Sequence, residues 1–399
     1  MKVGIIGGGA TGFFAAINIA ERHPTWEVEI LEKSNKVLSK VKVSGGGRCN
    51  VTNARSKPSE LINFYPRGGK SLYQVFEQFT TSDMVNWLAQ RGVPTHQEED
   101  LRMFPTTNDS QTIIDCFLNT ARKLRVKITK NCGVAKIIQE QEGWSLATSQ
   151  GNQTFDKLVV ASGGSPAVWR MLENIGLNIV PPVPSLFTFN IKDPRIEGLM
   201  GISFSDVKIK IIGTKLYEAG PLLITHWGLS GPAVLKLSAW GARELAAKDY
   251  KFNITVNYLG EVNSDQARTE IIQLKTNHPK RKVLNYPLFG LPKRFWEQLC
   301  TYCDINDEVI FGEFPKKQMN KLIEELTQGF YSVDGKSTFK EEFVTSGGIK
   351  LTEVNLSTFE SKRFPNLYLA GEVIDIDALT GGFNFQACWS EAWMISQNI

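Results

Sequence analysis

A glycine-rich run near the start of the chain has the spacing of a dinucleotide-binding turn. Gly7, Gly9 and Gly12 fit the pattern G-x-G-x-x-G, with Ala10 and Thr11 before the last glycine. The first glycine permits a tight turn, the second lets backbone approach a pyrophosphate, and the third allows close helix packing. The N-terminus of the following helix offers free N–H groups to the phosphate charge. The predicted chemistry is therefore the binding of a dinucleotide.

The elements around this turn support the same interpretation. Residues 2–6 are apolar and β-prone, residues 12–20 favour a helix, and residues 27–31 alternate with branched apolar side chains, which predicts a βαβ unit. Glu32 follows Gly12 by twenty residues, where an acid accepts hydrogen bonds from ribose hydroxyls and disfavours a 2′-phosphate. The predicted ligand is FAD or NAD; the alternative is a glycine-rich turn with an unrelated acid.

A second glycine triplet lies in a lysine-rich loop. Residues 33–53 place four lysines and an arginine around glycines 45–47. Such backbone can approach a phosphate or a flavin edge, whereas a solvated basic loop is the alternative on spacing alone. Cys49 stands beside Arg48, which would lower the pKa of the thiol and make it reactive. The alternative is that Cys49 only packs within the loop.

The length and net charge of the chain limit the number of domains and the classes of partner that can be expected. The chain has 399 residues, which at roughly 150 per domain predicts two or three domains and excludes a fibrous or disordered protein. Lysine and arginine number 45 against 41 acidic residues, a net charge of +4 that is too small for a dedicated nucleic-acid binder. We therefore expect a small-molecule substrate and no nucleic-acid partner, while the oligomeric state stays open.

Cysteine usage and hydropathy indicate a cytoplasmic protein with no membrane partner. Six cysteines are scattered over a long chain, which is typical of a reducing compartment. Cys300 and Cys303 form a C-x-x-C in an amphipathic stretch, where helix packing is favoured over a redox pair, and no further zinc ligands lie nearby. The apolar run after Met1 and Lys2 holds three successive glycines, which argues against a signal peptide. No run reaches the roughly 18 apolar residues of a membrane span.

The rest of the chain predicts further strands, a domain crossing and a helical region. Strand-like segments recur at residues 125–129, 134–139, 144–148 and 158–160, the inner ones suggesting an antiparallel meander. The prolines within residues 181–184 mark a crossing between domains, because they resist helix and central strand. Short strands follow from residue 187 to 217. The segments with helical patterns are residues 265–275, 293–300, 316–328 and the chain end from about 384.

Several motifs together resemble the BaiN-like FAD flavoproteins, a family of NAD(P)/FAD-dependent oxidoreductases that includes aminoacetone-oxidase-like enzymes. In chain order these motifs are residues 7–12 with Glu32, 44–53, 225–232, 345–348, and 370–375 with 380–386. The resemblance implies an α/β fold with a glutathione-reductase-type Rossmann FAD domain of residues 1–185 and 345–399. This domain would carry a β-barrel-like insert of residues 186–258 and 331–344, which itself carries a helical subdomain of residues 259–330.

The resemblance also assigns residues to the parts of FAD. Those implied for the ADP half are Gly7, Gly9, Ala10, Thr11, Gly12, Glu32, Lys33 and the backbone of Val134. Ala161 and Gly163 would close the second turn, Asp375 would reach the ribityl or phosphate region, and Gly371 would be a further cofactor-binding residue. Those implied along the flavin are Lys40, Gly47, Arg48, Cys49, Asn50 and the N–H groups of Gly382, Phe383 and Asn384. The assignment of the N–H groups of residues 382–384 also has physical support. A helix N-terminus carries about half a positive charge and would stabilise the anionic edge of reduced flavin.

Four positions depart from the family pattern. Leu38 stands where glycine is expected, Lys42 where an apolar residue is expected, Phe383 in place of a tyrosine, and Ala392 in place of a late glycine. The missing hydroxyl at Phe383 removes any phenolic hydrogen bond near the flavin. The backbone contacts of this segment would be retained.

Two reactions are compatible with these residues. No second G-x-G-x-x-G follows a strand between residues 158 and 349, so a nicotinamide donor would bind only transiently over the flavin. In the reductase hypothesis NAD(P)H reduces FAD and N5 passes hydride to a polarised C=C of a small or cyclic conjugated carbonyl compound. In the oxidase hypothesis the flavin oxidises a small aminoacetone-like amine and oxygen reoxidises the flavin. Both need proton transfer near N5, for which His226 is the candidate; a buried, hydrogen-bonded histidine is the alternative.

A third hypothesis is an RNA-modifying flavoprotein, because tRNA-modifying flavoproteins share the N-terminal fingerprint. Through residue 70 the chain holds eleven lysines and arginines against five acids. Without an RNA-binding motif, this excess is explained by attraction of a pyrophosphate and by solvated surface.

Overall fold

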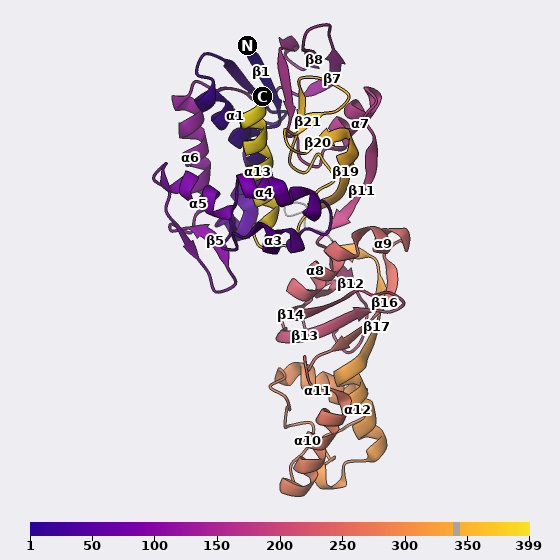
Figure 1. Ribbon diagram of the computed structural model, residues 1–399. Coiled ribbons are helices and arrows are strands. Elements are labelled where there is room, and N and C mark those ends of the chain that lie inside the picture. Colours follow the sequence, from indigo (N-terminus) through magenta and orange to yellow (C-terminus); the bar gives the residue numbers. More distant parts are fainter. Residues whose placement is uncertain (338–343) are drawn as a thin grey trace. The chain divides into compact units, whose positions relative to one another are not determined.

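The computed structural model describes residues 1–337 and 344–399. The chain forms two compact units, Met1–Val183 with Lys340–Ile399 and Pro184–Phe339. Both chain ends belong to the first unit (Figure 1). The proline-dense segment 181–184 contains the first crossing between the units. The predicted return segment 331–344 includes residues 338–343, which lie outside the described residues.

A largely parallel sheet forms the centre of the first unit. Among the described residues its strands follow the order β20 (Val354–Asn355), β21 (Glu360–Ser361), β22 (Leu367–Leu369), β10 (Lys157–Val160), β1 (Lys2–Ile6), β2 (Glu27–Leu31) and β6 (Lys127–Thr129). The strands from β22 to β6 run parallel. Most residues of β1, β2, β10 and β22 are buried, including Glu29 within β2, as expected when both faces of a parallel sheet are covered. The predicted βαβ unit is confirmed.

The two ends of the chain meet through their helices. The first helix, α1 (Ala10–Arg22), packs along the last helix, α13 (Phe383–Asn398) (Figure 1). Aromatic rings fill this contact: the centroid of Phe14 lies 5.4 Å from that of Trp389 and 6.4 Å from that of Phe117. This packing fixes the C-terminal helix against the helix that follows the glycine-rich turn.

Smaller elements complete the first unit. The helices are α2 (Ser39–Val43), α3 (Pro58–Leu61), α4 (Tyr73–Gln78), α5 (Thr81–Ala89), α6 (Ser110–Lys123) and α7 (Pro166–Asn174). The strands are β3 (Thr52–Asn53), β4 (Thr95–Gln97), β5 (Arg102–Pro105), β7 (Val134–Gln139), β8 (Trp144–Thr148), β9 (Gly151–Phe155), β11 (Ile179–Ser185) and β19 (Val344–Ile349). The expected meander is β7-β8-β9, whose third strand the sequence pattern did not predict. The prolines of residues 181–184 lie in β11, which within the described part of the chain pairs with β19 alone and so tolerates missing N–H donors.

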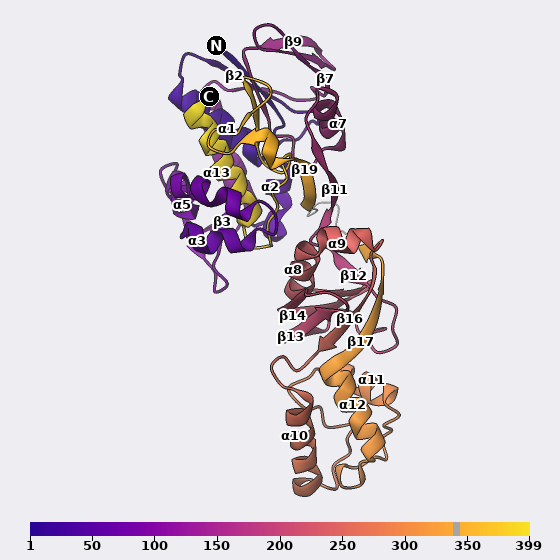
Figure 2. The same ribbon diagram turned by 45° about the vertical axis from the view of Figure 1, so that its right-hand side comes forward.

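An antiparallel sheet that closes on itself forms the centre of the second unit. Among the described residues its order is β17 (Gly329–Asp334), β16 (Lys251–Asn257), β13 (Ser203–Ile211), β14 (Tyr217–Thr225), β15 (Gly228–Ser230), β12 (Thr188–Asn190) and β18 (Lys336–Ser337). The outermost strands β17 and β18 are separated only by Gly335, so one stretch of chain pairs with both β16 and β12. This closure gives the expected barrel-like form. Helix α8 (Pro232–Trp240) packs on the sheet and leads to α9 (Ala242–Ala247) (Figure 2).

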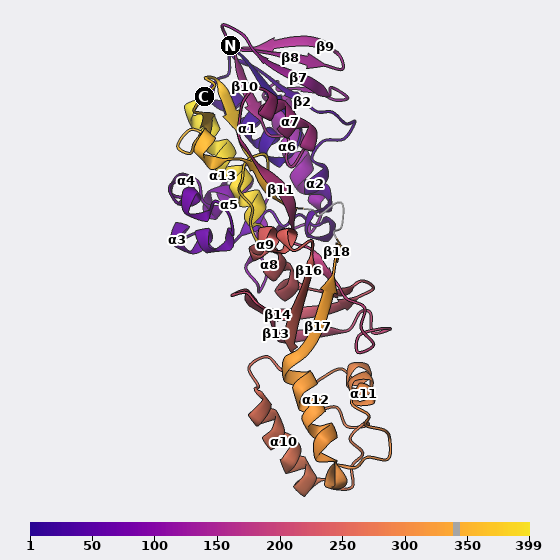
Figure 3. The same ribbon diagram turned by 90° about the vertical axis from the view of Figure 1, so that its right-hand side faces the viewer.

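Three helices of the second unit form a subdomain beside this sheet. They are α10 (Ser264–Asn277), α11 (Lys293–Tyr302) and α12 (Lys316–Gln328), close to the three predicted helical segments. Figure 3 shows α12 leading directly into β17. Among the described residues no helix is both long enough and apolar enough to cross a membrane.

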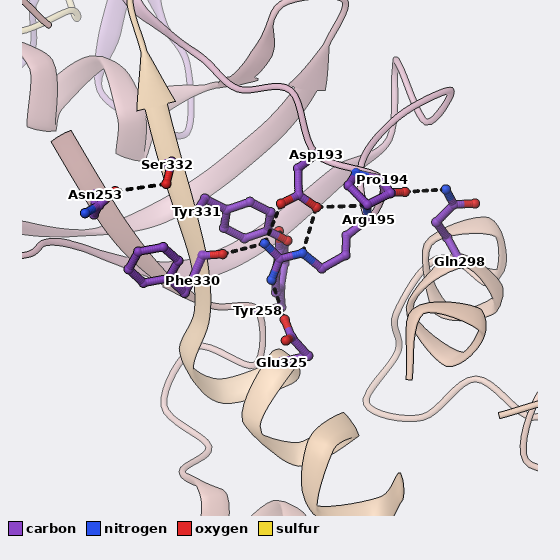
Figure 4. A network of polar contacts seen from close by, with 10 residues as sticks. All are labelled: Asp193, Pro194, Arg195, Asn253, Tyr258, Gln298, Glu325, Phe330, Tyr331 and Ser332. Carbon is purple, nitrogen blue, oxygen red and sulfur yellow. Dashed lines mark hydrogen bonds and ion pairs between the residues drawn. The ribbon is translucent and has the colours of Figure 1, made fainter. Parts of the chain in front are cut away.

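A buried arginine joins this helical subdomain to the sheet. Arg195 is 4% exposed and pairs with Asp193 and with Glu325 of α12. Its guanidinium also donates to the carbonyl oxygen of Phe330 in β17 and lies 3.9 Å from the ring centre of Tyr331 (Figure 4). Because a buried guanidinium is tolerated only with such partners, this network fixes the junction of α12 and β17.

Candidate cofactor site

The N-terminal glycines serve two different purposes in the folded chain. Gly7 has a φ of 113°, and a β-carbon there would lie 2.5 Å from the carbonyl oxygen of Ala161. A β-carbon at Gly12 would lie 2.0 Å from the carbonyl oxygen of Gly7. At Gly9 a β-carbon would meet nothing within 4 Å. Gly7 and Gly12 are therefore required by the protein's own packing, whereas Gly9 borders open space that a ligand can occupy.

Three loops converge at the carboxyl ends of the parallel strands. The N–H of Ala161, after β10, donates to the carbonyl oxygen of Ile6 at the end of β1, 2.9 Å away. Gly371, after β22, has a φ of 77° and approaches so closely that a β-carbon would lie 2.5 Å from Oγ1 of Thr11. Gly163 lies in the same loop as Ala161, with a φ of 63°. In open parallel sheets ligands bind at this edge.

Glu32 lies at the same edge, where two backbone groups orient its carboxylate. Its Oε2 accepts from the N–H of Gly8 and its Oε1 from the N–H of Ser34, both at 2.9 Å. The side chain is half-buried. Each carboxylate oxygen keeps a lone pair for a further donor, so Glu32 can accept from hydroxyl groups of a ribose.

The predicted adenine-side residues lie next to Glu32. The N–H of Cys132 donates to the carbonyl oxygen of Glu32 over 2.8 Å. A β-carbon at Gly133 would lie 3.8 Å from the β-carbon of Lys33, and Val134 follows as the first residue of β7. The structure therefore brings Lys33 and Val134 to the same end of the sheet as Glu32.

The second glycine triplet forms a turn that only glycine adopts easily. Residues 45–47 have φ values of 58°, 69° and 85°, in the left-handed region. β-carbons at the second and third of these glycines would meet nothing within 4 Å. The guanidinium of Arg48 pairs with Glu98 and lies 4.1 Å from the ring centre of Phe104. The loop thus presents open backbone at the glycines and an arginine held by other partners.

The structure argues against a reactive thiol at Cys49. The side chain is fully buried, and burial raises its pKa to about 12, with only partial compensation by a hydrogen bond from Ser44. Arg48 does not lower this pKa, because its charge is directed to Glu98. At neutral pH Cys49 is a protonated, packed thiol, in keeping with the alternative reading of the loop.

Lys40 and Glu372 connect two loops of the site. The Nζ of Lys40 pairs with Oε2 of Glu372, whose Oε1 accepts from the N–H of Thr345 over 2.9 Å. Leu38, where glycine was expected, adopts the left-handed conformation with a φ of 57° and a buried side chain. This conformation is one that glycine adopts without strain, and here a leucine adopts it.

The start of α13 closes the site from the other chain end. Gly382 has a φ of 88°, and a β-carbon there would lie 2.4 Å from the carbonyl oxygen of Thr52. With its amide oriented to satisfy both polar atoms, Asn50 accepts from the N–H of Gly382 and donates to Thr52. The side chain of Asn384 exchanges hydrogen bonds with the backbone of Ala378. The N–H of Gly382, which the sequence assigned to the flavin, is thereby bound to Asn50. The N–H groups of the first helical turn after it have no intrahelical acceptor and can bind a ligand.

Phe383 is a core residue. Its ring stacks on Phe64 with centroids 4.2 Å apart, and its carbonyl oxygen accepts from the hydroxyl of Tyr65 over 2.6 Å. The side chain is 2% exposed. A phenylalanine here suits this apolar packing, and any contact of this residue with a ligand comes from its backbone.

A buried ion pair, absent from the sequence prediction, holds the segment that contains Asp375. Nε of Arg67 donates to Oδ1 of Asp377 over 2.6 Å, and Nη2 of Arg67 pairs with Oδ2 of the same carboxylate. Asp377 is 1% exposed, and a β-carbon at Gly68 would lie 2.5 Å from Ile376. Asp375 is thereby held two residues from the ion pair. The only sequence signal was the R-G-G at residues 67–69, whose partner lies 310 residues away.

His226 belongs to the second unit. It forms the two-residue turn between β14 and β15 together with Trp227, and both side chains are exposed. Neither the apolar surroundings expected from its sequence neighbours nor the alternative of a buried histidine is found. An exposed turn lets the neighbouring strands keep their alternation while the imidazole stays in water.

The C-x-x-C pair is part of the core of the second unit. Cys300 and Cys303 are fully buried, and burial raises the pKa of both thiols, that of Cys303 to about 12. Neither is a thiolate at neutral pH, so the structure favours helix packing for this motif.

Glu391 is a buried acid of α13 that the sequence prediction missed. Its Oε2 accepts from the N–H of Gly371, and its Oε1 has no hydrogen-bond partner among the described residues. Burial raises its pKa to about 8, and the Gly371 bond lowers it in part. The side chain is therefore a neutral acid at neutral pH, and it supports the Gly371 loop from within the core.

Glu391→Gln is expected to flatten the dependence of stability on pH. The folded pKa lies above the unfolded value of 4.5, so the contribution of Glu391 is fully present below pH 4.5 and is lost as pH rises through about 8. Glutamine cannot ionise and removes this loss. Urea unfolding at several pH values checks the difference in slope between parent and variant. Parallel stability curves would contradict a neutral Glu391.

These residues fit an FAD molecule. Open backbone at Gly9 and at the 45–47 turn provides room beside a helix N-terminus, and Glu32 provides acceptors for a ribose. A second helix N-terminus, that of α13, lies in the same unit. Lys40, Arg48 and Arg67 of this unit are each paired with a carboxylate, so the donors offered to a ligand are mainly backbone N–H groups. The donors suit a pyrophosphate and an electron-rich ring system.

Comparison with known proteins identifies the family. The model of the HI0933-like protein Rossmann domain matches residues 1–398. The chain is 30% identical to the ribosomal RNA dihydrouridine synthase of Escherichia coli K12, over 99% of this chain and 97% of that one. It is 25% identical to the 3-dehydro-bile acid delta(4,6)-reductase of Clostridium scindens, over 98% and 97%.

A solved structure shares the architecture. The 3-ketosteroid-delta4-(5alpha)-dehydrogenase of Rhodococcus jostii RHA1 superposes with a TM-score of 0.50 over 100% of this chain and 96% of that one, at 13% identity. At this identity the likeness concerns the fold alone. The family match, the full-length relatives and the arrangement of the first unit lead to one conclusion: this chain belongs to the HI0933-like family of Rossmann-fold, FAD-dependent oxidoreductases.

Proposed function

We propose that this protein reduces a ring C=C bond conjugated to a carbonyl group, with NAD(P)H as the source of hydride. The observation that carries the proposal is the chemistry shared by two full-length relatives with different substrates. Dihydrouridine is uridine whose ring C=C, conjugated to a carbonyl, has gained two hydrogens. The double bonds of a 3-dehydro-bile acid at positions 4 and 6 are conjugated to its 3-keto group. Both substrates accept hydride at a carbon made electron-poor by the carbonyl.

The residues of the first unit have distinct roles in this proposal. Gly9 and the N-terminus of α1 would hold the pyrophosphate of FAD, and Glu32 its adenosine ribose. FAD supplies hydride transfer at N5 when bound. The N-terminus of α13 would place partial positive charge at the pyrimidine edge, where negative charge increases on reduction. The neutral Glu391 would keep the Gly371 loop in place without adding negative charge beside that edge.

Reduction of the C=C bond also needs one proton. Hydride bonds to the carbon β to the carbonyl, the C=C electron pair moves toward the carbonyl, and the α carbon takes a proton. His226 is proposed as the donor because imidazole serves as a general acid in many enzymes, and its exposed turn leaves it accessible to a substrate.

Anaerobic mixing tests the direction of the reaction. NADH or NADPH is expected to bleach the flavin absorbance of the purified holoprotein. Addition of 2-cyclohexenone or of oligouridine is then expected to restore the absorbance faster than dissolved oxygen does. Bleaching by aminoacetone together with indifference to both nicotinamides would instead establish the oxidase. His226→Gln should slow the step with the C=C substrate and leave bleaching by the nicotinamide unchanged.

A further inference from the structure

The helical subdomain carries a concentration of positive charge that the proposed chemistry does not use. Residues 271–296 hold six lysines and arginines and no aspartate or glutamate. This excess is larger than the net charge of +4 on the whole chain, so the remaining residues are net acidic. Seven consecutive residues, 276–282, are exposed where the chain leaves α10. They include the successive cations Lys280, Arg281 and Lys282.

A hollow of about 280 Å³ lies at the end of α10, and the three cations begin two positions after its lining residue His278 in the chain. Its lining combines aromatic rings with polar side chains that can donate and accept hydrogen bonds: Tyr286, Phe289, Gln273, Asn277, His278 and Glu270. The guanidinium carbon of Arg281 lies 4.5 Å from the ring centre of Tyr286. We call this hollow, together with Lys280, Arg281 and Lys282, the basic hollow. Its volume is just below the range that accommodates drug-sized ligands and suits a single planar ring.

The cations of the basic hollow are available for a ligand to different degrees. The Nζ of Lys282 lies 4.0 Å from Asp307 on the surface, a contact of little energetic value. Arg281 keeps its donors exposed while its planar face covers Tyr286. Lys280 is exposed between a proline and this arginine. Cations in a row beside an aromatic hollow are the combination that binds single-stranded nucleic acid, through phosphates and stacked bases.

We propose that the basic hollow is a docking site for single-stranded RNA, with one base in the hollow and successive phosphates on Lys280, Arg281 and Lys282. The inference rests on the proposed function and deepens it, because it names RNA as the class of molecule that carries the conjugated ring. The polar lining provides partners for a base edge and for a ribose 2′-hydroxyl. The net charge of the chain concealed this site because acidic residues elsewhere offset it.

Binding of a fluorescent oligouridine to the FAD-loaded protein tests the docking site. Anisotropy is measured over a series of salt concentrations for the parent, for Lys280→Ala/Lys282→Ala and for the control Lys316→Ala/Lys317→Ala. Both pairs remove two exposed charges from the same subdomain. The first pair is expected to weaken binding roughly tenfold and to reduce the slope of log K against log salt by about 1.4, two single-strand phosphate contacts. Equal loss in both pairs, or in neither, would overturn the proposal.

Arg281→Lys tests the stacking part of the site. Lysine keeps the charge but has no planar face, so affinity is expected to fall roughly fivefold with little change in the salt slope. Free uridine monophosphate should compete only weakly, because it offers one phosphate. Competition by the mononucleotide equal to that of the oligomer would reassign the hollow to a free nucleotide and overturn RNA docking.

Flavin measurements separate this inference from the proposed function. Bleaching by NAD(P)H and turnover of 2-cyclohexenone are followed in the same variants. If the parent reduces the enone but does not bind oligouridine, docking is wrong and the reductase stands. If oligouridine binds through the basic hollow but no C=C substrate reoxidises the flavin, the reductase is wrong and the binding site stands.

Discussion

Gly9→Ala is expected to leave the folded protein intact and to weaken FAD binding about ten- to hundredfold. Gly9 has extended backbone, with a φ of −93°, and a β-carbon there meets no protein atom within 4 Å. The added methyl group would occupy the space through which a pyrophosphate reaches the backbone and the α1 N-terminus. The loss corresponds to one hydrogen bond to a charged group, about 1.5–3 kcal/mol. Equilibrium titration of apoprotein with FAD measures the change.

A second glycine of the same turn provides the contrast. Gly12→Ala adds the same methyl group three residues later, where it would lie 2.0 Å from the carbonyl oxygen of Gly7. This variant should lose both stability and FAD binding. The free energy of unfolding of Gly9→Ala, in contrast, should lie within about 0.5 kcal/mol of that of the parent. Unchanged FAD affinity in a folded Gly9→Ala protein would show that the cofactor does not approach this turn.

Arg67→Ala is expected to lower the free energy of unfolding of the protein by about 3–5 kcal/mol. The change removes the guanidinium from the fully buried carboxylate of Asp377, and breaking a buried ion pair on one side costs about this much. FAD retention should fall as well, because the pair holds the segment with Asp375. Urea unfolding and the flavin content of the purified protein measure the two effects.

The control for Arg67 is an exposed ion pair of the same unit. Lys57 lies 3.4 Å from Glu60, with side chains 77% and 50% exposed, so Lys57→Ala should cost about 0–1 kcal/mol. Arg67→Lys keeps the charge but cannot make the bidentate contact of a guanidinium. Its free energy of unfolding should therefore lie between those of the parent and the alanine variant. A loss below about 1 kcal/mol for Arg67→Ala would mean that the pair does not organise this segment.

The sequence predicted what depends on short stretches of chain. The strands at residues 2–6 and 27–31, the helix between them and the helices of the helical subdomain follow from hydrophobic periodicity, which a local pattern records directly. Helices α8 and α9 of the second unit were not predicted. The same holds for the glycine turns, since a left-handed conformation or a close backbone approach restricts residue type at one position. Even Leu38, an exception in type, keeps the backbone conformation.

The environment of each chemical group was decided by the tertiary structure. Cys49 beside Arg48 has the sequence of an activated thiol, yet burial keeps it protonated. His226 has apolar sequence neighbours, yet a hairpin turn exposes it. Desolvation and charge pairing act through space, so residue type and spacing along the chain do not predict them.

By itself, then, the sequence determined the dinucleotide turn, the βαβ unit around it and the family. Only the tertiary structure decided that Arg67 pairs with Asp377 and that Glu391 supports Gly371 as a neutral acid. The features that the sequence determined depend on the sterics of residues that are neighbours in the chain. The features that the tertiary structure decided depend on the packing of α13, from the opposite chain end, against α1. The burial that this packing creates sets the charge states around the cofactor site.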